Sequence, residues 1–226
     1  MARRPLIVFD VNETLLDIDT LEPLFAEIFA APGRMREWFA QVILYSQAIS
    51  LAGPYVPFGA LGGGVLRMLG QIHGVVITDD HVRALGSYVS SMPVHADVAD
   101  GLDVLKEAGF ALVTLTNSAP SSGPDPLDRA GLGSMFARRF TVDAVQRFKP
   151  APATYRHVAD TMGAAPEDVW LIAAHTWDTI GAQSFGWKAA LVTRGVNAPL
   201  PLDGVPQPTL IARDVGEAAR AIVAGL

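Results

Sequence analysis

Four short apolar runs constrain the fold of this chain more than any other feature. They are four to seven residues long, rich in aliphatic and β-branched side chains, and lie at 6–9, 110–116, 169–174 and 189–193. Continuous runs of this length predict strands that are buried on both faces, as in a parallel sheet. Helical patterns lie between the later runs, at 97–109, 151–163 and 176–186. The alternation of strands and helices predicts a doubly wound α/β fold.

The segment from residue 18 to residue 92 interrupts this alternation. It contains no convincing strand pair, and its amphipathic patterns predict helices throughout. We therefore expect a core α/β domain made of residues 1–17 and 93–226, with residues 18–92 inserted after the first strand as a helical cap. An insert at this point would lie over the carboxyl end of the sheet, where open α/β folds bind their ligands.

Composition argues against several classes of partner and site. The net charge of -6 argues against nucleic acid or an anionic membrane, because both are polyanions. The sequence has no cysteine, which excludes disulfides and thiolate metal sites. The first apolar run ends on Asp10 and is too short for a signal peptide, and no stretch approaches the length of a transmembrane helix. We expect a cytoplasmic protein that binds neither nucleic acid nor membrane.

Small polar or charged residues follow the expected strands, namely Asp10 with Thr14, Thr116 with Asn117, Lys149, and His175 with Asp178. Because the carboxyl ends of parallel strands meet at one edge of a sheet, these side chains are expected to lie together. Asp10 would serve as a carboxylate nucleophile, and Lys149 would keep it ionised and oriented. Thr116 would donate a hydrogen bond, and Asp178 would hold Lys149 or orient a water molecule.

Each of these residues also has an ordinary structural explanation. Asp10 and the Thr116-Asn117 pair suit turns, and Asp178 suits the first turn of a helix. A lysine that precedes a proline, as Lys149 does, is more often on the surface. The occurrence of all of them in this order is what indicates a site.

In this order the residues resemble those of the haloacid dehalogenase (HAD) superfamily of aspartate-nucleophile hydrolases. The matching stretches are VFDVNETLLD (8–17), LVTLTNS (112–118), RFKPAPATY (147–155) and LIAAHTWDTIGAQSFGWKAALVTR (171–194). Within the superfamily the chain looks most like the type II 2-haloacid dehalogenases, because Tyr155 follows Lys149 and Trp177 precedes Asp178. The resemblance implies a Rossmann-like core, a cap in the position of the early helical segment, and a homodimer.

The resemblance also implies the activity, which is hydrolytic dehalogenation of a small 2-haloalkanoic acid without a cofactor or metal ion. Asp10 would displace the halide from carbon, and water would then hydrolyse the aspartyl ester to give the 2-hydroxy acid. Covalent catalysis of this kind divides one difficult displacement into two easier steps. The implied catalytic residues are Asp10, Thr14, Thr116, Lys149 and Asp178, and the implied substrate-binding residues are Val11, Asn12, Asn117, Ser118, Tyr155, His175 and Trp177.

Asn12 separates this function from that of the superfamily's phosphatases. Those enzymes carry Asp-x-Asp in the first motif, and the second aspartate protonates the leaving group, which Asn12 cannot do. A departing halide needs no proton. Phosphatases also have an acidic metal ligand where this chain has Ala174, so a Mg²⁺ site would be short of oxygen ligands. Two alternatives stay open, namely a Mg²⁺-dependent phosphatase that uses Asp10 and a non-catalytic binding protein that kept the fold.

The halide end of the site departs from the type II pattern. Asn12 and Glu13 stand where an aromatic residue and glycine are usual, and Ala173-Ala174-His175 replaces Ser-Ser-Asn. The arginine of the cap that faces the halide is expected at the position of Ile49, which removes a cation where negative charge develops. A protonated His175 would partly replace that cation, although a locally bonded histidine is equally consistent with the sequence.

Other cap residues have two interpretations each. Arg34 and Arg36 are further candidates to replace the missing cation, with surface solvation as the more ordinary role. Four aromatic residues of the cap fit either an apolar pocket or dimer contact or, more ordinarily, packing between cap helices; they are Trp38, Phe39, Tyr45 and Tyr55.

Overall fold

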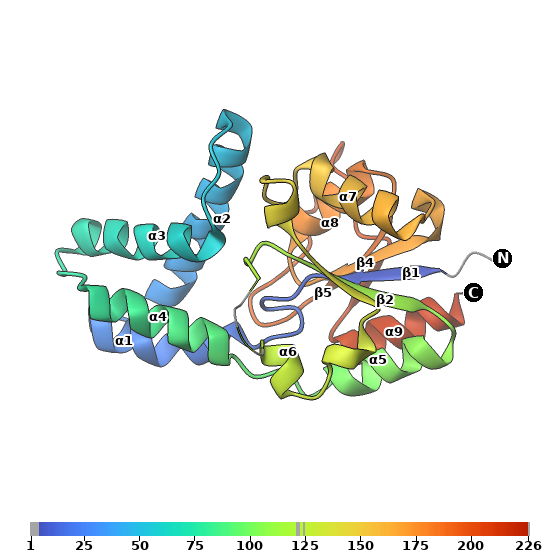
Figure 1. The fold of residues 1–226 in the computed structure, drawn as a ribbon, viewed down its shortest axis with the longest axis horizontal. Helices are drawn as coiled ribbons and strands as arrows, with labels where there is room; N and C mark the ends of the chain where they lie inside the picture. The colour runs from blue at the N-terminus through green and yellow to red at the C-terminus, as the bar shows by residue number, and fades with distance from the viewer. Residues whose placement is uncertain (1–4, 121–122, 124, 226) are drawn as a thin grey trace.

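The structure is a computed structural model that describes residues 5–120, 123 and 125–225 (Figure 1). Six strands form an all-parallel sheet in the order β3-β2-β1-β4-β5-β6. Their bounds are Leu6–Phe9 for β1, Ala111–Thr116 for β2, Arg138–Thr141 for β3, Val169–Ala173 for β4, Lys188–Val192 for β5 and Leu210–Ala212 for β6. The sheet grows outward from β1 and β4 in both directions, so the predicted doubly wound fold is confirmed.

Helices cover both faces of the sheet, which explains why its central strands are apolar throughout. Figure 1 shows α7 and α8 on one face and α5 and α9 on the other. All four residues of β1 are buried, and a strand covered on both sides has no polar face to alternate with. The helices that cover the sheet are α5 (Val98–Glu107), α7 (Pro152–Met162), α8 (Thr176–Ser184) and α9 (Val215–Ala224). The single-turn α6 (Pro126–Arg129) lies in the connection from β2 to β3.

Local sequence signals set the ends of α7. Pro152 occupies the first turn, where its missing N–H leaves no partner unsatisfied. Gly163 ends the helix with a φ of +62°, a left-handed conformation that glycine adopts without steric cost. Short 3-10 helices connect other elements, namely η1 (Ile18–Leu21), η2 (Gly133–Met135), η3 (Val142–Ala144) and η4 (Pro166–Asp168).

Register brings the carboxyl ends of the central strands level. Phe9 lies opposite both Thr114 of β2 and Ile172 of β4. The pairing continues for one step beyond β1, because the Asp10 N–H donates to the Ile172 carbonyl at 3.1 Å. The residues that follow β1, β2 and β4 therefore meet at one edge of the sheet.

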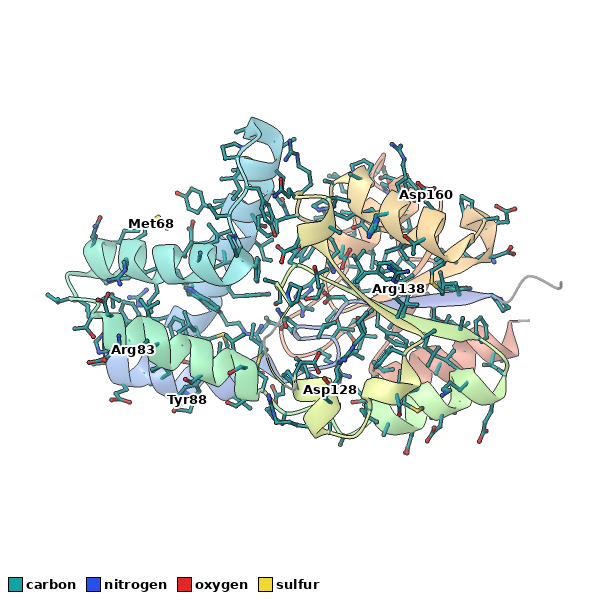
Figure 2. All side chains as sticks on the ribbon, viewed as in Figure 1. Met68, Arg83, Tyr88, Asp128, Arg138 and Asp160 are labelled. Carbon is teal, nitrogen blue, oxygen red and sulfur yellow. The ribbon has the colours of Figure 1, made fainter. Side chains whose placement is uncertain are left out.

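Four helices follow β1 and lie beyond this carboxyl edge (Figure 1). We call them the insert; they are α1 (Glu22–Phe29), α2 (Arg34–Ala52), α3 (Phe58–His73) and α4 (Asp79–Ser91). Trp38 ties α2 to α3 by donating its Nε1–H to the Gly62 carbonyl at 2.9 Å. A Cβ on Gly62 would lie 3.2 Å from the Trp38 ring, so glycine permits this close approach. Arg83 and Tyr88 lie on the outer surface of the insert (Figure 2).

The four predicted strands are present with shifts of about one residue at their ends, whereas β3 and β6 were not predicted. Both missed strands are at sheet edges, and they are only four and three residues long with mixed burial. They therefore lack the continuous apolar run that marks a central strand. No helix in the described part of the chain is long and apolar enough to cross a membrane.

Candidate active site

Asp10 lies at the carboxyl end of β1 and is held by three side chains. Its Oδ1 accepts a hydrogen bond from the Lys149 ammonium at 2.8 Å. Its Oδ2 accepts from the Thr14 hydroxyl at 2.6 Å and lies 3.1 Å from Nδ1 of His175. The side chain is only 6% exposed. A nearly buried carboxylate with donors on both oxygens is fixed in direction, as a nucleophile must be.

Lys149 is a fully buried cation between two carboxylates. Its Nζ lies 2.8 Å from Asp10 Oδ1 and 2.5 Å from Asp178 Oδ2. Tyr155 fixes the second carboxylate, because its hydroxyl donates to Asp178 Oδ1 at 2.7 Å. Asn117 holds the lysine backbone by accepting its N–H at 3.0 Å. Taking each ion out of water costs several kcal/mol, which the attraction between the ions often does not fully offset, so a buried cluster of this kind adds little to folding stability.

Thr14 joins the loop after β1 to the end of β4. Its hydroxyl donates to Asp10 Oδ2 and accepts the Ala174 N–H at 2.8 Å. The residue is fully buried. Because the Thr14 oxygen accepts the Ala174 N–H, the hydroxyl proton is free to be donated to Asp10, which fixes the direction of the hydrogen bond between Thr14 and Asp10.

His175 bridges Asp10 to a second acidic residue, Glu13. Nδ1 lies 3.1 Å from Asp10 Oδ2, and Nε2 lies 2.8 Å from Glu13 Oε2. The ring stacks on Trp177 with centroids 5.0 Å apart and an interplanar angle of 17°, and Phe39 of α2 contacts it at 5.5 Å. Because both ring nitrogens face carboxylate oxygens, the arrangement favours the doubly protonated imidazolium.

The charges around Asp10 decide its ionisation. Burial alone would raise the pKa of Asp10, but the charge of Lys149 and the hydrogen bond from His175 outweigh it and hold the pKa far below its usual range. Burial opposes the charged form of His175, yet its hydrogen bonds to Asp10 and Glu13 raise the pKa of the imidazole to about 9. At neutral pH the site therefore contains an ionised Asp10 carboxylate between two cations.

Glu13 occupies a backbone conformation that is unusual for its residue type. Its φ is +67°, in the left-handed region, and its side chain is only 4% exposed. One carboxylate oxygen faces His175, and the other accepts a hydrogen bond from Arg36 of α2. Arg36 also bonds Asp19. The insert thus reaches the site through an arginine that we expected to be solvated at the surface.

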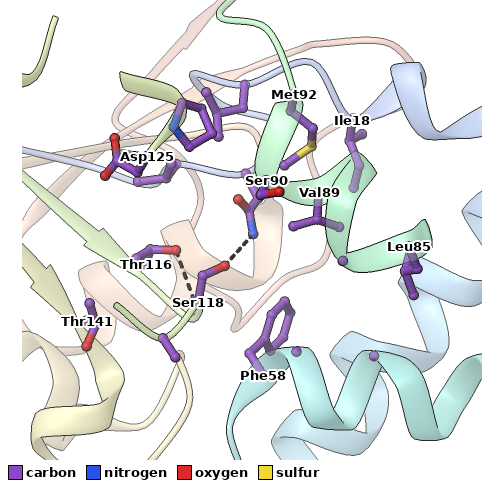
Figure 3. Close-up of a pocket in the computed structure, with 18 of the residues that line it drawn as sticks. Ile18, Phe58, Leu85, Val89, Ser90, Met92, Thr116, Ser118, Asp125 and Thr141 are labelled. Atoms are coloured by element: carbon purple, nitrogen blue, oxygen red, sulfur yellow. Dashed lines mark hydrogen bonds between the residues drawn. The ribbon is translucent and has the colours of Figure 1, made fainter. Parts of the chain in front are cut away.

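A cavity of about 360 Å³ lies between the insert and the core, near the loop that follows Asp10. Figure 3 shows Phe58, Leu85 and Val89 of the insert on one side and Thr116 and Ser118 of the core on the other. The Asn12 amide donates to the Ser118 hydroxyl at 3.0 Å on the wall of the cavity. Apolar side chains line most of the cavity, and the neighbours of Asp10 in sequence, Val11 and Asn12, form part of its edge.

The structure links four of the five candidate catalytic residues directly by hydrogen bonds, namely Asp10, Thr14, Lys149 and Asp178. Thr116 has a different partner, because its Oγ1 accepts the Ser118 N–H at 3.1 Å. Ser118 was expected to bind the substrate. Both residues nevertheless line the cavity.

The candidate substrate-binding residues divide into three groups. Val11, Asn12 and Ser118 line the cavity, whereas His175 and Trp177 pack beside the nucleophile. Two others lie away from any space for a substrate. Tyr155 is fully buried against Asp178, Phe185 and Trp187, and Asn117 is turned toward the Lys149 backbone.

The candidate residues of the insert differ in their burial and contacts. Trp38 and Phe39 are buried and line the cavity, while Tyr45 is partly exposed and Tyr55 donates to Asp143. Ile49 is partly buried against the apolar core. Arg34 pairs with Glu37 at 2.6 Å on the insert.

Two residues that contact the site were missed or given another role, Glu13 and Arg36. Glu13 was noted only as a departure from the usual glycine. The signal that could have found Glu13 is that Glu13 and His175 both depart from the usual residues at their positions, since an acid and a base that do so together can be partners.

No group of three or more His, Cys, Asp or Glu side chains in the described part of the chain could hold a metal ion. The carboxylates of Asp10 and Asp178 are bridged by the ammonium of Lys149.

Comparison with known proteins places this geometry in context. A family model described as a haloacid dehalogenase-like hydrolase matches residues 5–186. An (S)-2-haloacid dehalogenase of Pseudomonas fluorescens is 28% identical over 222 residues, which cover 97% of this chain and 96% of that protein.

Solved structures share the fold. The L-2-haloacid dehalogenase RSc1362 has a TM-score of 0.88 at 24% identity, with coverage of 98% of this chain and 99% of that chain. An L-2-haloacid dehalogenase from Xanthobacter autotrophicus with chloropropionic acid covalently bound has a TM-score of 0.83 at 24% identity, with coverage of 97% and 98%. At these identities the likeness concerns the fold.

Proposed function

Because the chain belongs to the haloacid dehalogenase-like hydrolase family, we propose that it hydrolyses the carbon–halogen bond of a 2-halo acid, with Asp10 as the nucleophile. The observation that carries the proposal is the environment of Asp10, an ionised carboxylate fixed by Lys149, Thr14 and His175, whose sequence neighbours Val11 and Asn12 line an apolar cavity. The product would be the 2-hydroxy acid.

The names of the relatives support the substrate class. The relative from Pseudomonas fluorescens is named for (S)-2-halo acids, and it matches this chain over almost the full length of both. The solved structure of the L-2-haloacid dehalogenase from Xanthobacter autotrophicus contains chloropropionic acid covalently bound. We therefore propose the (S)-enantiomer of the substrate and a covalent intermediate for this chain.

In the first step, an oxygen of Asp10 attacks the carbon that bears the halogen. Oδ1 suits this role, because Lys149 is its one donor while Oδ2 carries bonds from both Thr14 and His175. The carbon–halogen bond breaks as the carbon–oxygen bond forms, and the halide leaves with its electron pair. The reaction needs no proton for the leaving group, which is consistent with an amide rather than an acid at Asn12.

In the second step, water attacks Cγ of the ester and releases the hydroxy acid. One proton of the water goes to the product hydroxyl, the other leaves to solvent, and Asp10 returns as a carboxylate. Lys149 stays near Oδ1, and Asp178 holds Lys149 through both steps with support from Tyr155. Because the first step has formed an ester, the second step requires only that water attack its carbonyl carbon.

The cavity suits the substituent on C2 of the substrate. Its volume of about 360 Å³ is at the lower end of the range for drug-sized ligands, and most of its lining is apolar. Asn12 and Ser118 on its wall are polar groups that would receive the substrate carboxylate. We expect acids with longer apolar chains at C2 to be accepted along with small ones.

We propose further that residues 18–92 act as a cap domain on a core of residues 1–17 and 93–226, and that the chain forms a homodimer. The position of the insert over the carboxyl edge of the sheet supports the first part (Figure 1). Measurement of the molar mass in solution tests the second part.

The test is halide release from fluoro-, chloro- and bromoacetate and from each enantiomer of 2-chloropropionate, with EDTA present. Wild type is compared with Asp10→Asn and with Asp103→Asn, a surface aspartate on α5, as the matched control. We expect release by wild type and the control but not by Asp10→Asn. Phosphate release from a generic ester that depends on Mg²⁺, without any halide release, would overturn the proposal in favour of a phosphatase.

A further inference from the structure

We propose that Glu13 and His175 form a charged pair that stabilises the oxyanion on Asp10 while the ester is hydrolysed. This inference rests on the proposed function and adds a role to it. His175 would be a catalytic residue, because it contacts the reacting carboxyl group, and Glu13 would be a positioning residue that acts through it. Arg36 of the insert would hold Glu13 in turn.

The geometry of the imidazole is the first support. Nδ1 lies 3.1 Å from Asp10 Oδ2 and Nε2 lies 2.8 Å from Glu13 Oε2, so each nitrogen faces a carboxylate oxygen. A neutral imidazole would present one nitrogen lone pair to a carboxylate. Protonation removes that repulsion and gives two charge-assisted hydrogen bonds.

The two carboxylates that face His175 favour this state. Asp10 approaches His175 from β1 and Glu13 from the loop that follows, and each carries a cation on its far side, Lys149 and Arg36 respectively. The His175 ring is fixed between Phe39 of α2 and Trp177 of α8, with 5% of the side chain exposed. Water therefore has little access to the imidazolium, and the ring cannot turn freely.

The backbone of Glu13 is the second, independent support. A left-handed conformation is unfavourable for a non-glycine residue, and the φ of Glu13, +67°, lies in that region. Glycine would avoid this cost. The chain places a buried acid there, and both of its oxygens have partners, so the carboxylate offsets the strain through the contacts it makes with His175 and Arg36.

The role follows from the atoms that meet at Asp10. When water attacks Cγ of the ester, the electron pair of the carbonyl moves onto Oδ2, where the Nδ1–H of His175 and the hydroxyl of Thr14 both point. Two donors on one oxygen form an oxyanion hole. Collapse of the tetrahedral intermediate breaks the bond from Cγ to the ester oxygen, and His175 stays protonated throughout.

The experiment has one arm that needs no substrate. The His175 pKa is measured by NMR titration in wild type, in Glu13→Gln, and in Glu37→Gln as the matched control. Glu37 lies 3.1 Å from Nε2 of His73 on the insert, so the control removes an acid from another Glu–His pair outside the site. We expect a wild-type pKa near 9, a clear fall in Glu13→Gln, and no change at His175 in Glu37→Gln.

The second arm follows one turnover by rapid quench. In His175→Asn we expect one equivalent of halide with a modest slowing, because Lys149 and Thr14 still hold Asp10, followed by ester hydrolysis slowed on the order of 10²–10³-fold. The ester should then accumulate as an adduct in the intact protein mass. In Glu13→Gln the alkaline limb of the hydrolysis rate should move to lower pH.

The two failures can be told apart. A wild type that releases no halide from any 2-halo acid overturns the proposed function and the oxyanion role together. An active wild type whose His175 titrates at its ordinary pKa overturns the pair alone. Equal slowing of halide release and ester hydrolysis in His175→Asn, without an adduct, also overturns the oxyanion role and would assign His175 to alignment of Asp10.

Discussion

Asp10 and His175 show how burial and neighbouring charge decide protonation at the scale of single residues. Both side chains are almost excluded from water, which by itself favours their neutral forms. The ionised partners around them reverse this preference, so one is held as an anion and the other as a cation. Such reversal needs close contacts from β1, from the loop after β1 and from α8, and the fold supplies them at one sheet edge.

The stability of the protein should depend on pH through His175. Its pKa is raised from 6.5 to about 9 on folding, so its contribution is fully present below about pH 6.5 and is lost as the pH rises through 9. Urea unfolding of wild type and His175→Asn between pH 6 and 10 measures this. We expect the difference between the two proteins to shrink across that window. A difference that stays constant with pH would show that His175 is neutral in the folded protein.

Glu13 allows a direct measurement of backbone strain. Glu13→Gly and Glu13→Ala both remove the contacts to His175 and Arg36, but only alanine keeps a Cβ at a φ of +67°. We expect Glu13→Ala to be less stable than Glu13→Gly by about 1 kcal/mol in chemical denaturation. Equal stability, or a more stable alanine variant, would contradict the left-handed conformation.

Much of the site could be predicted from the sequence, because strand ends in a parallel sheet converge wherever the strands are found. Asp10, Thr14, Lys149 and Asp178 each follow or precede a recognisable element, and they meet. Tyr155 and Arg36 could not be placed in the same way. Their contacts depend on how their helices are rotated about the helix axis. The pattern of apolar runs does not specify this rotation to within one side chain.

At the scale of elements, the contact between α7 and α8 positions Tyr155 and Asp178 beside Lys149. Gly181 of α8 faces Tyr155, whose hydroxyl holds Asp178. A Cβ on Gly181 would lie 2.5 Å from Cβ of Pro150 and would also clash with the Tyr155 hydroxyl, since packed atoms do not approach so closely. The glycine therefore sets how near the two helices lie, and thereby where Asp178 sits beside Lys149.

Gly181→Ala should separate these helices. We expect a loss of about 1–3 kcal/mol in the free energy of unfolding from overpacking, together with a lower kcat as Asp178 shifts. Gly64→Ala is the matched control, because Gly64 is an exposed α3 residue at which an added Cβ would have no atom within 4 Å. Alanine should stabilise that helix by up to about 1 kcal/mol. Equal effects of the two substitutions in urea unfolding would contradict the packing argument.

The elements that the sequence predicted well are those with enough residues to carry a periodic signal. β1, β2, β4 and β5 have continuous apolar runs, and the insert helices have clear amphipathic patterns. The edge strands β3 and β6 are too short and too exposed to show such a run. They owe their conformation to pairing with β2 and β5, which is a tertiary contact.

At the scale of the whole molecule, polar contacts connect the insert to the core around the cavity. Arg36 bonds Glu13, the Phe148 N–H donates to the Ser50 hydroxyl at 2.9 Å, and Tyr55 bonds Asp143. The contacts lie at the start of α2, near its end and in the segment before α3. They hold the insert over the carboxyl edge of the sheet, so the cavity between the two parts has a defined shape.

The size of this cavity should determine which acids are accepted. Val89→Trp on α4 would fill part of it, whereas Tyr88→Trp changes the neighbouring residue on the outer surface and serves as the control (Figures 2 and 3). We expect KM for a 2-halo acid with a long apolar chain to rise about tenfold in Val89→Trp, because each buried methylene is worth about 0.8 kcal/mol. 2-Chloropropionate should be affected little. An equal rise for both acids would contradict placement of the chain in the cavity.

The central claim is that Asp10 forms an ester with the substrate, and isotope transfer tests it most directly. Wild type in excess over (S)-2-chloropropionate is allowed one turnover in H₂¹⁸O, and the product and the peptide that contains Asp10 are analysed by mass spectrometry. Attack by Asp10 predicts a hydroxy acid without ¹⁸O and an Asp10 carboxylate that carries it, since water enters at Cγ. A labelled hydroxy acid with an unlabelled Asp10 peptide would mean that water displaces the halide directly, and the account would be wrong.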